Sequence, residues 1–564
     1  MVDDKRGGRL KKLYWLLAAL AALPAYAGDA TQFDWFEYTG RDAAYDAPLP
    51  RGSFHNPILA GYYPDPGVAR VGDKYYLVNS TFSHWPGIPV HESTDLVHWR
   101  LIGHALNDPS KLSFDGLGTS RGVFAPSIHF HDGKFYIVNT LVDAGGNFFV
   151  TAKNPAGPWS DPVWLKEIDG IDPSFFFDDD GKAYIVNNGP PEGTPLYNGH
   201  RAIWIQQFDV ASQKLVGPRK VIVNGGADPA KQPIWIEGPH LYHINGWYYL
   251  MCAEGGTERN HSEVIFRAKS PWGPFEPYAD NPILTQRDLP ADRANPVTNS
   301  GHADLIQMKD GSWWAVFLAS RPYRDYLFNT GRETFLLPVT WKDGWPIILE
   351  HEAAIPLTLP GPKAMTAASA RGADALSGNF TKRDDFDGKL GTEWITVHVP
   401  KHASDGITQS GRLFISAEHA TLADRRHAGF LARRQQHLNF DATTEMEAWL
   451  PGIEAGLAAF QNENHWYFLG LRTGAGKDIE VFLRRAAGTA ADEVTSATVA
   501  TPKSGRLRLR ISGAGPNYSF YYDAGAGWQS LRENDDGTIL STEKAGGFVG
   551  TVIGPYAQER WTKP

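Results

Sequence analysis

The segment DGKFYIV (132–138) is one of five versions of the same turn-and-strand unit. The other four are GDKYYLV (72–78), DGKAYIV (180–186), NGWYYLM (245–251) and DGSWWAV (310–316). A glycine beside Asp or Asn favours a tight turn, and the aromatic and β-branched residues that follow favour a strand. Successive units lie 48 to 65 residues apart, which suits about four short strands per unit. Strand-built repeats of this size predict a β-propeller, here with five blades.

Acidic residues occupy the aligned position in three of these units. Asp65 in YYPDPGV, Asp172 in GIDPSFF and Glu237 in WIEGPHL lie nine or ten residues before the aligned turn residue, where the other two units have Ala125 and His302. Because the first strand of each blade lines the central channel, we expect the carboxylates to converge. The spacing from acid to aligned turn residue is nine in one unit and ten in others, which weakens the alignment. One extra residue turns a side chain to the other face of a strand unless a longer turn compensates for it.

Converging carboxylates indicate a particular chemistry. Asp-Pro and Asp-Gly pairs are common in turns, so one aspartate proves little, and Asp178, Asp179 and Asp180 read as a solvated hairpin turn. Three acids at one aligned position are better explained by catalysis. Glycoside hydrolysis needs one protonated acid and one ionised carboxylate. A third carboxylate can separate their pKa values by like-charge repulsion.

Composition excludes several classes of function. The chain has 564 residues and a formal net charge of −9, which disfavours binding to nucleic acid or anionic membranes and allows a neutral partner such as a sugar. Its only cysteine, Cys252, cannot form a disulfide within the chain. No Cys/His cluster has the spacing of a zinc site.

Residues 1–27 read as a signal peptide. A basic segment precedes LYWLLAALAALPAYA (13–27), which has a short apolar core and ends in Ala-Tyr-Ala. A membrane anchor is the alternative, but the apolar run is shorter than the roughly 20 residues that span a bilayer. We therefore expect an exported protein, periplasmic or extracellular, with no membrane span after cleavage.

The sequence predicts two domains and an all-β fold. We assign the five-bladed propeller to residues 50–358 and a linker to 359–379, where small and polar residues follow no period. From 380 to 564 alternating segments such as RLRLRIS (506–512) predict a β-sandwich of the jelly-roll type.

The combined motifs resemble glycoside hydrolase family 43, which includes β-xylosidases and α-L-arabinofuranosidases. The matching segments include YYPDPGV (62–68), GVFAPSIHF (122–130), IDPSFFFDDDGKAYIV (171–186) and WIEGPHLYHINGWYYL (235–250). GGFVGTVIGPY (546–556) is similar to the concanavalin A-like domain of the β-xylosidase branch. The resemblance covers roughly residues 50–560.

The resemblance implies a role for each acid. Asp65 would be the general base that activates water, and Glu237 the general acid. Asp172 would raise the pKa of the acid and orient it. The family inverts anomeric configuration, so the base and the acid are expected about 6.5–9.5 Å apart.

Further pocket residues are implied in the same way. Phe82, Trp85 and Phe124 match aromatic positions that surround the sugar in relatives. The alternative for these rings is a place in the propeller core. Arg332 in TGRETF matches an arginine that binds sugar hydroxyls, and it is also expected near Asp172; a surface salt bridge is the alternative.

The resemblance also bears on cofactors and on the second domain. His302 matches an axial histidine that in some relatives contacts calcium or water in the channel, so a calcium ion held through water near His302 is one expectation. No organic cofactor is implied. The sandwich either binds polysaccharide as a separate module or packs on the propeller, with Phe548 reaching the pocket rim.

These features together predict an exo-acting, inverting glycosidase that removes xylose from the non-reducing ends of β-1,4-xylooligosaccharides. An α-L-arabinofuranosidase acting on arabinoxylan or arabinan side chains is the alternative within the family. A non-catalytic carbohydrate-binding propeller is the alternative of another class, and it would require the loss of at least one of the three acids. A retaining fructan-type propeller enzyme is disfavoured because the chain has YYPDP in place of that class's WMNDP-type segment.

Overall fold

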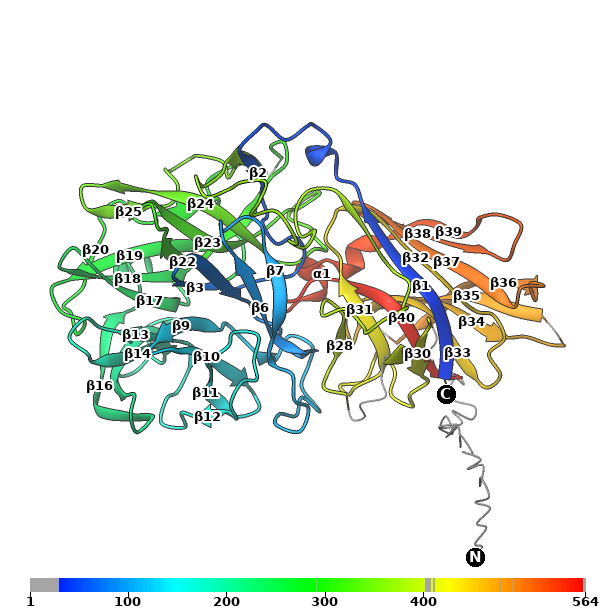
Figure 1. Cartoon of the computed structure of the whole chain (residues 1–564), viewed down its shortest axis with the longest axis horizontal. Coiled ribbons are helices and arrows are strands. Elements are labelled where there is room, and N and C mark those ends of the chain that lie inside the picture. The colour runs from blue at the N-terminus through cyan, green and yellow to red at the C-terminus, as the bar shows by residue number, and fades with distance from the viewer. Residues whose placement is uncertain are drawn as a thin grey trace, which may run out of the picture.

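The computed structural model describes residues 30–290, 292–400, 407–408, 411–476, 478–488 and 490–560. Two β-domains lie side by side, a propeller from blue to green and a sandwich mostly from yellow to red (Figure 1). Helical structure in these ranges is limited to four short elements: α1 (Thr542–Ala545), η1 (Ala43–Tyr45), η2 (Pro229–Lys231) and η3 (Gly537–Leu540). The predicted all-β class is confirmed. The predicted signal peptide, 1–27, falls outside the described residues, among which no helix is long and apolar enough to cross a membrane.

Five antiparallel sheets form the blades, and in each of them one of the predicted repeats supplies the first hairpin turn and the strand that follows it. Their strands are β3 (Gly67–Val71), β4 (Lys74–Val78), β6 (Gly87–Ser93) and β7 (Arg100–Leu106); β8 (Gly122–Val123), β9 (Ser127–His131), β10 (Lys134–Val142), β11 (Gly146–Ala152) and β12 (Val163–Trp164); β13 (Ile171–Phe177), β14 (Ala183–Gly189), β15 (Ala202–Asp209) and β16 (Lys214–Asn224); β17 (Glu237–Ile244), β18 (Trp247–Glu254), β19 (Ser262–Ala268), β20 (Glu276–Pro277) and β21 (Leu284–Thr285); and β22 (Thr298–Gln307), β23 (Trp313–Ser320), β24 (Glu333–Lys342) and β25 (Trp345–Ile347).

The blades close into a ring. The first strands β3, β9, β13, β17 and β22 contact one another in cyclic order, so that β22 returns to β3. The backbone N–H of Val68 donates to Asp304 Oδ2 over 2.8 Å and joins the first blade to the last. A short pair, β2 (Ser53–His55) with β26 (Thr358–Pro360), brings the two ends of the propeller segment together.

The turn residues behave as their chemistry requires. Asp132 and Gly133 both have positive φ, 46° and 74°, and so do Asn245 and Gly246, 50° and 74°. Positive φ at both central residues defines the two-residue hairpin turn that matches strand twist. The Asp-Gly and Asn-Gly signals therefore set where the first strands of the second and fourth blades end.

The second domain is a sandwich of two sheets with an apolar core between them. One sheet contains β29 (Ile407–Thr408), β30 (Leu413–Ser416), β1 (Ala30–Gly40), β32 (Asn439–Glu447), β37 (Arg506–Ala514), β38 (Asn517–Asp523) and β39 (Gln529–Asp536), with β27 (Phe380–Asp384) paired to β1. The other contains β36 (Asp492–Ala500), β35 (Asp478–Ala487), β34 (His465–Thr473), β33 (Ile453–Asn462), β40 (Val552–Glu559), β31 (Gly429–Arg434), β28 (Ile395–Val397) and β5 (His84–Trp85).

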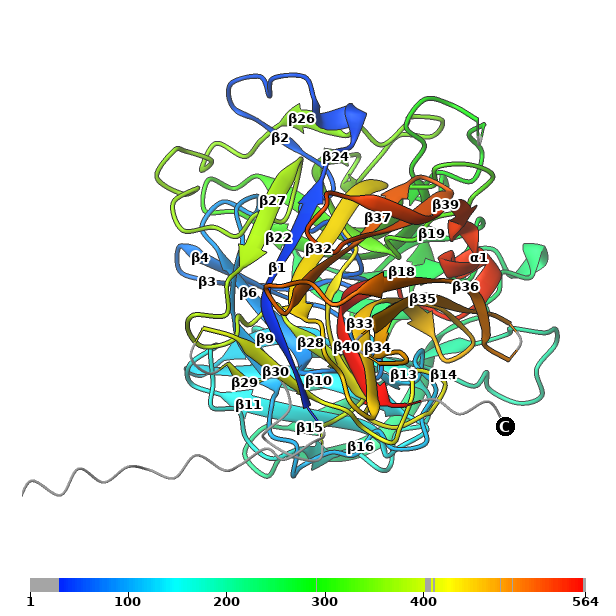
Figure 2. The ribbon, with the colours of Figure 1, turned by 90° about the vertical axis from the view of Figure 1, so that its right-hand side faces the viewer.

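Two strands of the sandwich come from parts of the chain that sequence analysis did not place there. β1 lies between β30 and β32, so the blue strand crosses the yellow and orange sheet (Figure 2). β5, from within the propeller segment, pairs with β28 through Trp85 and Thr396. The sandwich is therefore built from distant parts of the chain.

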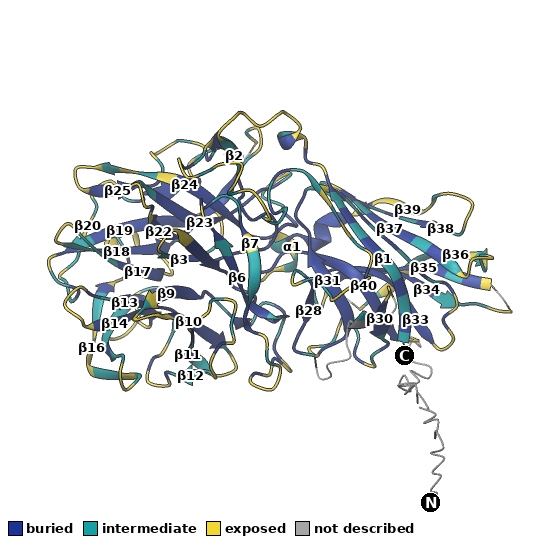
Figure 3. Ribbon diagram, in the orientation of Figure 1, coloured by how far each residue is buried: buried dark blue, intermediate teal, exposed yellow. Residues whose placement is uncertain are grey.

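Buried polar groups join the two domains. The region between them is largely dark blue in Figure 3, which marks buried residues. Arg321 of the propeller donates to Glu333 Oε2 over 2.6 Å, to Asp42 Oδ2 over 3.0 Å and to the carbonyl of Gln436 over 3.0 Å. Removing one partner would leave an uncompensated buried charge, which costs about 3–5 kcal/mol. The contact between the two domains therefore depends on these buried ion pairs and hydrogen bonds as well as on shape.

Candidate active site

The three acids lie at the same end of the first strands. Asp65 comes two residues before β3, Asp172 is the second residue of β13, and Glu237 is the first residue of β17. All three line one cavity of about 480 Å³, together with His302 and Arg332. Each acid is more than nine-tenths buried. The structure therefore brings the aligned positions of the repeats together.

A β-bulge in one blade and a longer turn in another account for the uneven spacing of the acids. The pairing of β17 with β18 shifts by one residue between Glu237 and His240, whereas β3 pairs with β4 without a shift. Both hairpins have two-residue turns, so the extra residue in the fourth blade lies in the bulge. In the third blade the extra residue lies in the turn, which has three residues between Asp178 and Lys182, and β13 also has a bulge between Ile171 and Ser174. A bulge places two residues opposite one and re-aims the side chains, which keeps these acids on the channel.

Asp65 has neighbours that favour its ionised form. Arg332 Nη1 lies 3.1 Å from its Oδ1, Ser80 Oγ donates to its Oδ2 over 2.5 Å, and His302 Nδ1 is 3.9 Å away. Burial opposes ionisation, but these neighbours, Arg332 foremost, hold the pKa of Asp65 below its ordinary value. An ionised carboxylate in a dry site is suited to accept a proton.

Asp172 and Glu237 have the opposite electrostatics. Burial, and after it the charge of Asp65, raises the pKa of Asp172. Burial, and after it the charges of Asp172 and Asp65, raises the pKa of Glu237 well above its ordinary value. The backbone N–H of Gly238 donates to Asp172 Oδ2 over 3.2 Å and fixes that carboxylate. The site thus contains one ionised carboxylate and a coupled pair that retains a proton.

The backbone is strained around the cavity. Asp65, Phe82, Asp172, Trp235 and His302 all have φ between 51° and 54°, a left-handed conformation that is uncommon for residues other than glycine. Such conformations persist where the surrounding structure imposes them, and they concentrate at active sites and ligand clamps.

A glycine next to the acid makes room for a histidine. A Cβ at Gly238 would lie 2.9 Å from the His302 ring, so only glycine lets β17 approach β22 this closely. Position 238 therefore allows the first strands of the fourth and fifth blades to meet directly beside Glu237.

Three phenylalanines form an apolar wall. Phe82 is 5.2 Å from Phe124 and 5.8 Å from Phe548, and Phe124 is 5.7 Å from Phe548, measured between ring centroids. Apolar rings of this kind suit the C–H faces of a sugar. Phe548 comes from the sandwich, and its backbone N–H donates to Ser120 Oγ of the propeller segment over 2.9 Å. The second domain thus contributes a side chain to the cavity.

Two of the expected residues have different surroundings from those predicted. Trp85 is not among the residues that line the cavity; its ring packs edge-on against Phe114, 5.8 Å away, inside the propeller core. Its backbone is committed to β5, and that pairing turns the ring away from the channel. Arg332 lies in the cavity with Asp172, and its charge favours the ionised form of that acid as expected, but its ion pair is with Asp65.

Among the further lining residues that sequence analysis missed, two have chemistry suited to a sugar. Arg201 and Trp235 both line the cavity, with the Arg201 guanidinium 5.0 Å from the Trp235 ring. Trp235 was visible in the WIEGPH motif two residues before Glu237, and a tryptophan so close to a candidate acid was the available signal. Arg201 comes from a different part of the chain and had no signal in the sequence.

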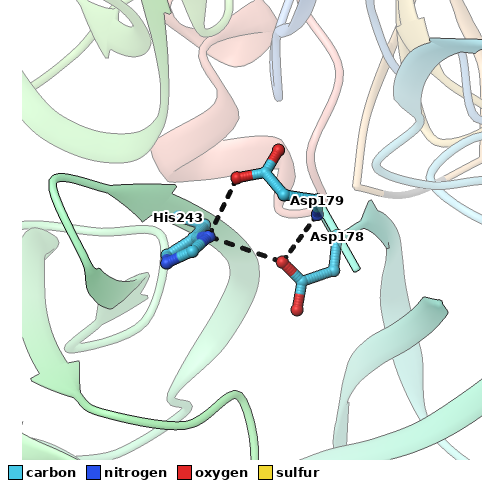
Figure 4. A group of neighbouring side chains, drawn as sticks. All are labelled: Asp178, Asp179 and His243. Atoms are coloured by element: carbon cyan, nitrogen blue, oxygen red, sulfur yellow. Dashed lines mark hydrogen bonds and ion pairs between the residues drawn. The ribbon is translucent and has the colours of Figure 1, made fainter. Parts of the chain in front are cut away.

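His302 is not part of the group of side chains whose geometry suits a metal ion. Among the described residues, one group of three side chains has suitably close ligand atoms: Asp178, Asp179 and His243 (Figure 4). Asp178 and Asp179 follow the end of β13, and His243 is the last residue but one of β17, so the group lies at the opposite end of these strands from the acids. Asp65, whose Oδ1 is 3.9 Å from His302 Nδ1, is already paired with Arg332, and calcium prefers several oxygen ligands. The protein side chains around His302 do not form a calcium cage, and an ion held there through water stays a prediction.

Comparison with known proteins gives a consistent result. The model of "Glycosyl hydrolases family 43" matches residues 54–346, and that of the "Beta xylosidase C-terminal Concanavalin A-like domain" matches residues 383–564. A non-reducing end α-L-arabinofuranosidase of Bacteroides ovatus is 37% identical over 530 residues, which cover 90% of this chain and 92% of that one. A xylosidase/arabinosidase of Butyrivibrio fibrisolvens is 38% identical, over 89% and 95% of the two chains. The crystal structure of a family-43 enzyme from a capybara gut metagenome superposes with a TM-score of 0.88 at 39% identity, covering 94% of this chain and all of that one.

Proposed function

The chain belongs to glycosyl hydrolase family 43 and is a glycoside hydrolase of the xylosidase/arabinosidase group, and from this premise we propose that it is an inverting, exo-acting enzyme that removes terminal α-L-arabinofuranosyl residues. The observation that carries the mechanism is the electrostatic contrast between Asp65 and Glu237. The arabinofuranosyl preference rests on two full-length relatives at 37% and 38% identity, both of which have arabinosidase activity in their names.

In the proposed mechanism Asp65 accepts a proton from a water molecule as that water attacks the anomeric carbon. Glu237 donates its proton to the glycosidic oxygen as the bond from that oxygen to the anomeric carbon breaks. The leaving group departs as an alcohol, and the pentose is released with inverted configuration at its anomeric carbon. Asp172 keeps the proton on Glu237 by like-charge repulsion. Arg332 holds Asp65 ionised and is placed to donate hydrogen bonds to sugar hydroxyls.

Cleavage of terminal β-D-xylosyl residues is the second candidate. Three observations favour it: the match of the C-terminal domain to a β-xylosidase domain, the dual name of the Butyrivibrio relative, and the names of two further relatives, "Beta-xylosidase" of Bacillus subtilis at 34% identity and "Putative beta-xylosidase" of Escherichia coli at 33%. Both substrates end in a pentose, so the same acids and apolar wall serve either one.

Initial rates test the proposal. The protein is assayed on 4-nitrophenyl α-L-arabinofuranoside, 4-nitrophenyl β-D-xyloside and xylobiose, and NMR follows the anomer released first. We expect the inverted anomer and a higher kcat/KM on the arabinofuranoside. Higher kcat/KM on the two xylosides would select the second candidate, and the retained anomer would overturn the mechanism. Pretreatment with a chelator tests the expected calcium in the same assay.

A further inference from the structure

An exposed apolar rim lies on one side of the cavity mouth. Leu196, Ile234 and Trp235 are 81%, 39% and 39% exposed, and they are three of the six large apolar side chains exposed in the described part of the chain. The loops that carry them adjoin, because Trp235 N–H donates to the carbonyl of Gly199 and the Tyr197 hydroxyl to that of Pro233, each over 2.9 Å. Ile234 and Trp235 line the cavity. Exposed apolar groups gathered at a cavity mark a binding surface more often than isolated ones do.

Trp235 is held in place at a conformational cost. Its φ of 52° is in the left-handed region, where a bulky side chain is disfavoured and glycine or asparagine is tolerated. Gly199 next to it has a φ of 81° and lies against Ile234, where an added Cβ would come within 2.8 Å. A tryptophan that is both strained and partly exposed does little for the stability of the fold, which leaves ligand binding as its use.

Arg201 is fixed beside this ring. Its Nε and Nη2 donate to Asn188 Oδ1 over 3.1 and 2.6 Å, and Asn188 Nδ2 donates in turn to the carbonyl of Ile236 over 2.6 Å. Arg201 Nη1 bonds no other residue in the ranges that the structure describes. The guanidinium therefore presents a donor into the cavity from a rigid position, 5.0 Å from the Trp235 ring.

The position of the acid shows which sugar this rim meets. Glu237 gives its proton to the oxygen that joins the released pentose to the leaving group, so the leaving group must lie next to Glu237. Trp235 precedes Glu237 by two residues, which span at most about 7 Å. The phenylalanine wall comes from the first two blades and the sandwich, whereas Trp235 and Arg201 come from the third and fourth blades.

We propose that Trp235 and Arg201 form the binding site for the first sugar ring of the leaving group, with Trp235 against the C–H face of a pyranose and Arg201 bonded to its hydroxyls. This assignment rests on the proposed exo-glycosidase function and deepens it. It makes Trp235 a specificity residue that selects glycosides linked to another sugar over glycosides linked to a small alcohol.

The test compares two leaving groups that both require protonation. Wild type, Trp235→Ala and Trp235→Asn are assayed on a pentosyl-xylooligosaccharide and on the methyl glycoside of the same pentose. We expect kcat/KM on the oligosaccharide to fall roughly 10-fold in both variants, mainly through KM, as for loss of one aromatic contact. The methyl glycoside, which has no second ring, should lose less than about twofold, and Trp235→Phe should recover part of the loss.

Stability measurements separate this role from a structural one. Asparagine tolerates the left-handed backbone, so Trp235→Asn should keep or raise the Tm while it loses oligosaccharide activity. Trp449→Ala is the matched control, because Trp449 is 40% exposed in the sandwich, away from the cavity. Trp449→Ala should change the rate on neither the oligosaccharide nor the methyl glycoside.

Each result decides the question. Equal losses on both substrates, or no loss on the oligosaccharide, would overturn the assignment. Inactivity of the wild type on every pentoside would instead overturn the proposed function, and the two failures are therefore distinguishable. If Trp235→Ala fails to fold, Trp235→Asn and Trp235→Phe carry the test.

Discussion

Arg332 donates a hydrogen bond from Nη1 to Oδ1 of Asp65 over 3.1 Å, and each of the two side chains is nearly excluded from solvent. The arginine is 267 positions further along the chain, in the loop before β24 of the last blade, while Asp65 precedes the first strand of the first blade. Closure of the propeller ring therefore creates the pair. An ion pair of this kind decides which of the three acids is ionised.

Replacing Arg332 should shift the acidic limb of the pH–rate profile. Arg332→Met removes the charge that lowers the pKa of Asp65, so that pKa rises and the base is protonated at a higher pH. We expect kcat/KM at the pH optimum to fall about 10²- to 10³-fold, as for loss of one preorganised charged donor, and the acidic limb to move toward neutral pH. Arg332→Lys should restore part of the shift. An unchanged limb would show that Arg332 does not control the base.

Loss of the general acid should depend on the leaving group. Glu237→Ala should lower the rate on 4-nitrophenyl and oligosaccharide substrates by about 10²- to 10⁴-fold, the usual contribution of general acid catalysis. A 2,4-dinitrophenyl glycoside needs no protonation and should lose much less. Comparable losses on both classes of substrate would contradict the assignment of Glu237 as the general acid. Asp65→Ala is the control, because loss of the base should abolish activity on both classes.

Asp172 should determine the pH at which activity falls on the alkaline side of the pH–rate profile. Its charge raises the pKa of Glu237 after burial has done so, and Asp172→Asn removes that repulsion. The pKa of Glu237 then falls, the acid loses its proton at lower pH, and the alkaline limb should move down by about one to two pH units. The pH dependence of kcat/KM measures this directly. A limb that stays in place would assign the alkaline titration to another group.

The contribution of the sandwich can be tested through Phe548. Phe548→Ala removes the one cavity-lining ring that the second domain supplies, and we expect KM for every pentoside to rise by about 10-fold, since an aromatic contact is lost. Thermal unfolding should change little, because Phe548 is only partly buried. Phe130→Ala, at an exposed phenylalanine outside the cavity, should leave KM unchanged.

Buried histidines should make the domain junction sensitive to acid. Burial, and after it the charge of Arg434, lowers the pKa of His84 and His104 to about 3 and that of His91 well below its ordinary value. The folded state therefore takes up these protons at lower pH than the unfolded state does. Their contribution to stability is complete above the ordinary pKa of about 6.5 and is lost progressively as the pH falls toward 3.

One substitution at that junction isolates the effect. The His91 nitrogens have no hydrogen-bond partner in the described part of the chain, so His91→Leu removes a titrating group at little cost in bonds. We expect a smaller decrease in the free energy of unfolding between pH 7 and pH 4 than in wild type, measured by urea denaturation. His419→Leu, at an exposed histidine of the sandwich, is the control and should follow wild type. Identical slopes for wild type and His91→Leu would refute the prediction.

The sequence supported the prediction of the propeller because its repeats carry their own turn chemistry. Asp132-Gly133 and Asn245-Gly246 end the first strands where their positive φ values require, so the blade count followed from local signals. The position of β1 in the sandwich had no such signal. The sequence of a single strand shows its own alternation of apolar and polar residues, but it does not show which distant strands will pair with it.

The candidate site was predictable to the extent that it follows the repeats. Asp65, Asp172 and Glu237 converge because equivalent positions in a ring converge. The orientation of Trp85 was not predictable, because the pairing of β5 with a strand more than 300 residues later decides it. The pairing of Arg332 with Asp65 depends in the same way on how the ring closes.

The location of β1 has a consequence for the order of events on the ribosome. Tyr38, in β1, accepts a hydrogen bond from the backbone N–H of Gln436, 398 positions further along the chain. At about 5–20 residues per second, that partner emerges roughly 20 to 80 seconds after β1 does. During this time the first strand to be synthesised has an unpaired edge while the complete propeller is made between it and its neighbours. A chain begun at the first blade would lack a strand from the middle of the sandwich sheet, so the second domain cannot be transferred to another protein by cutting after the propeller.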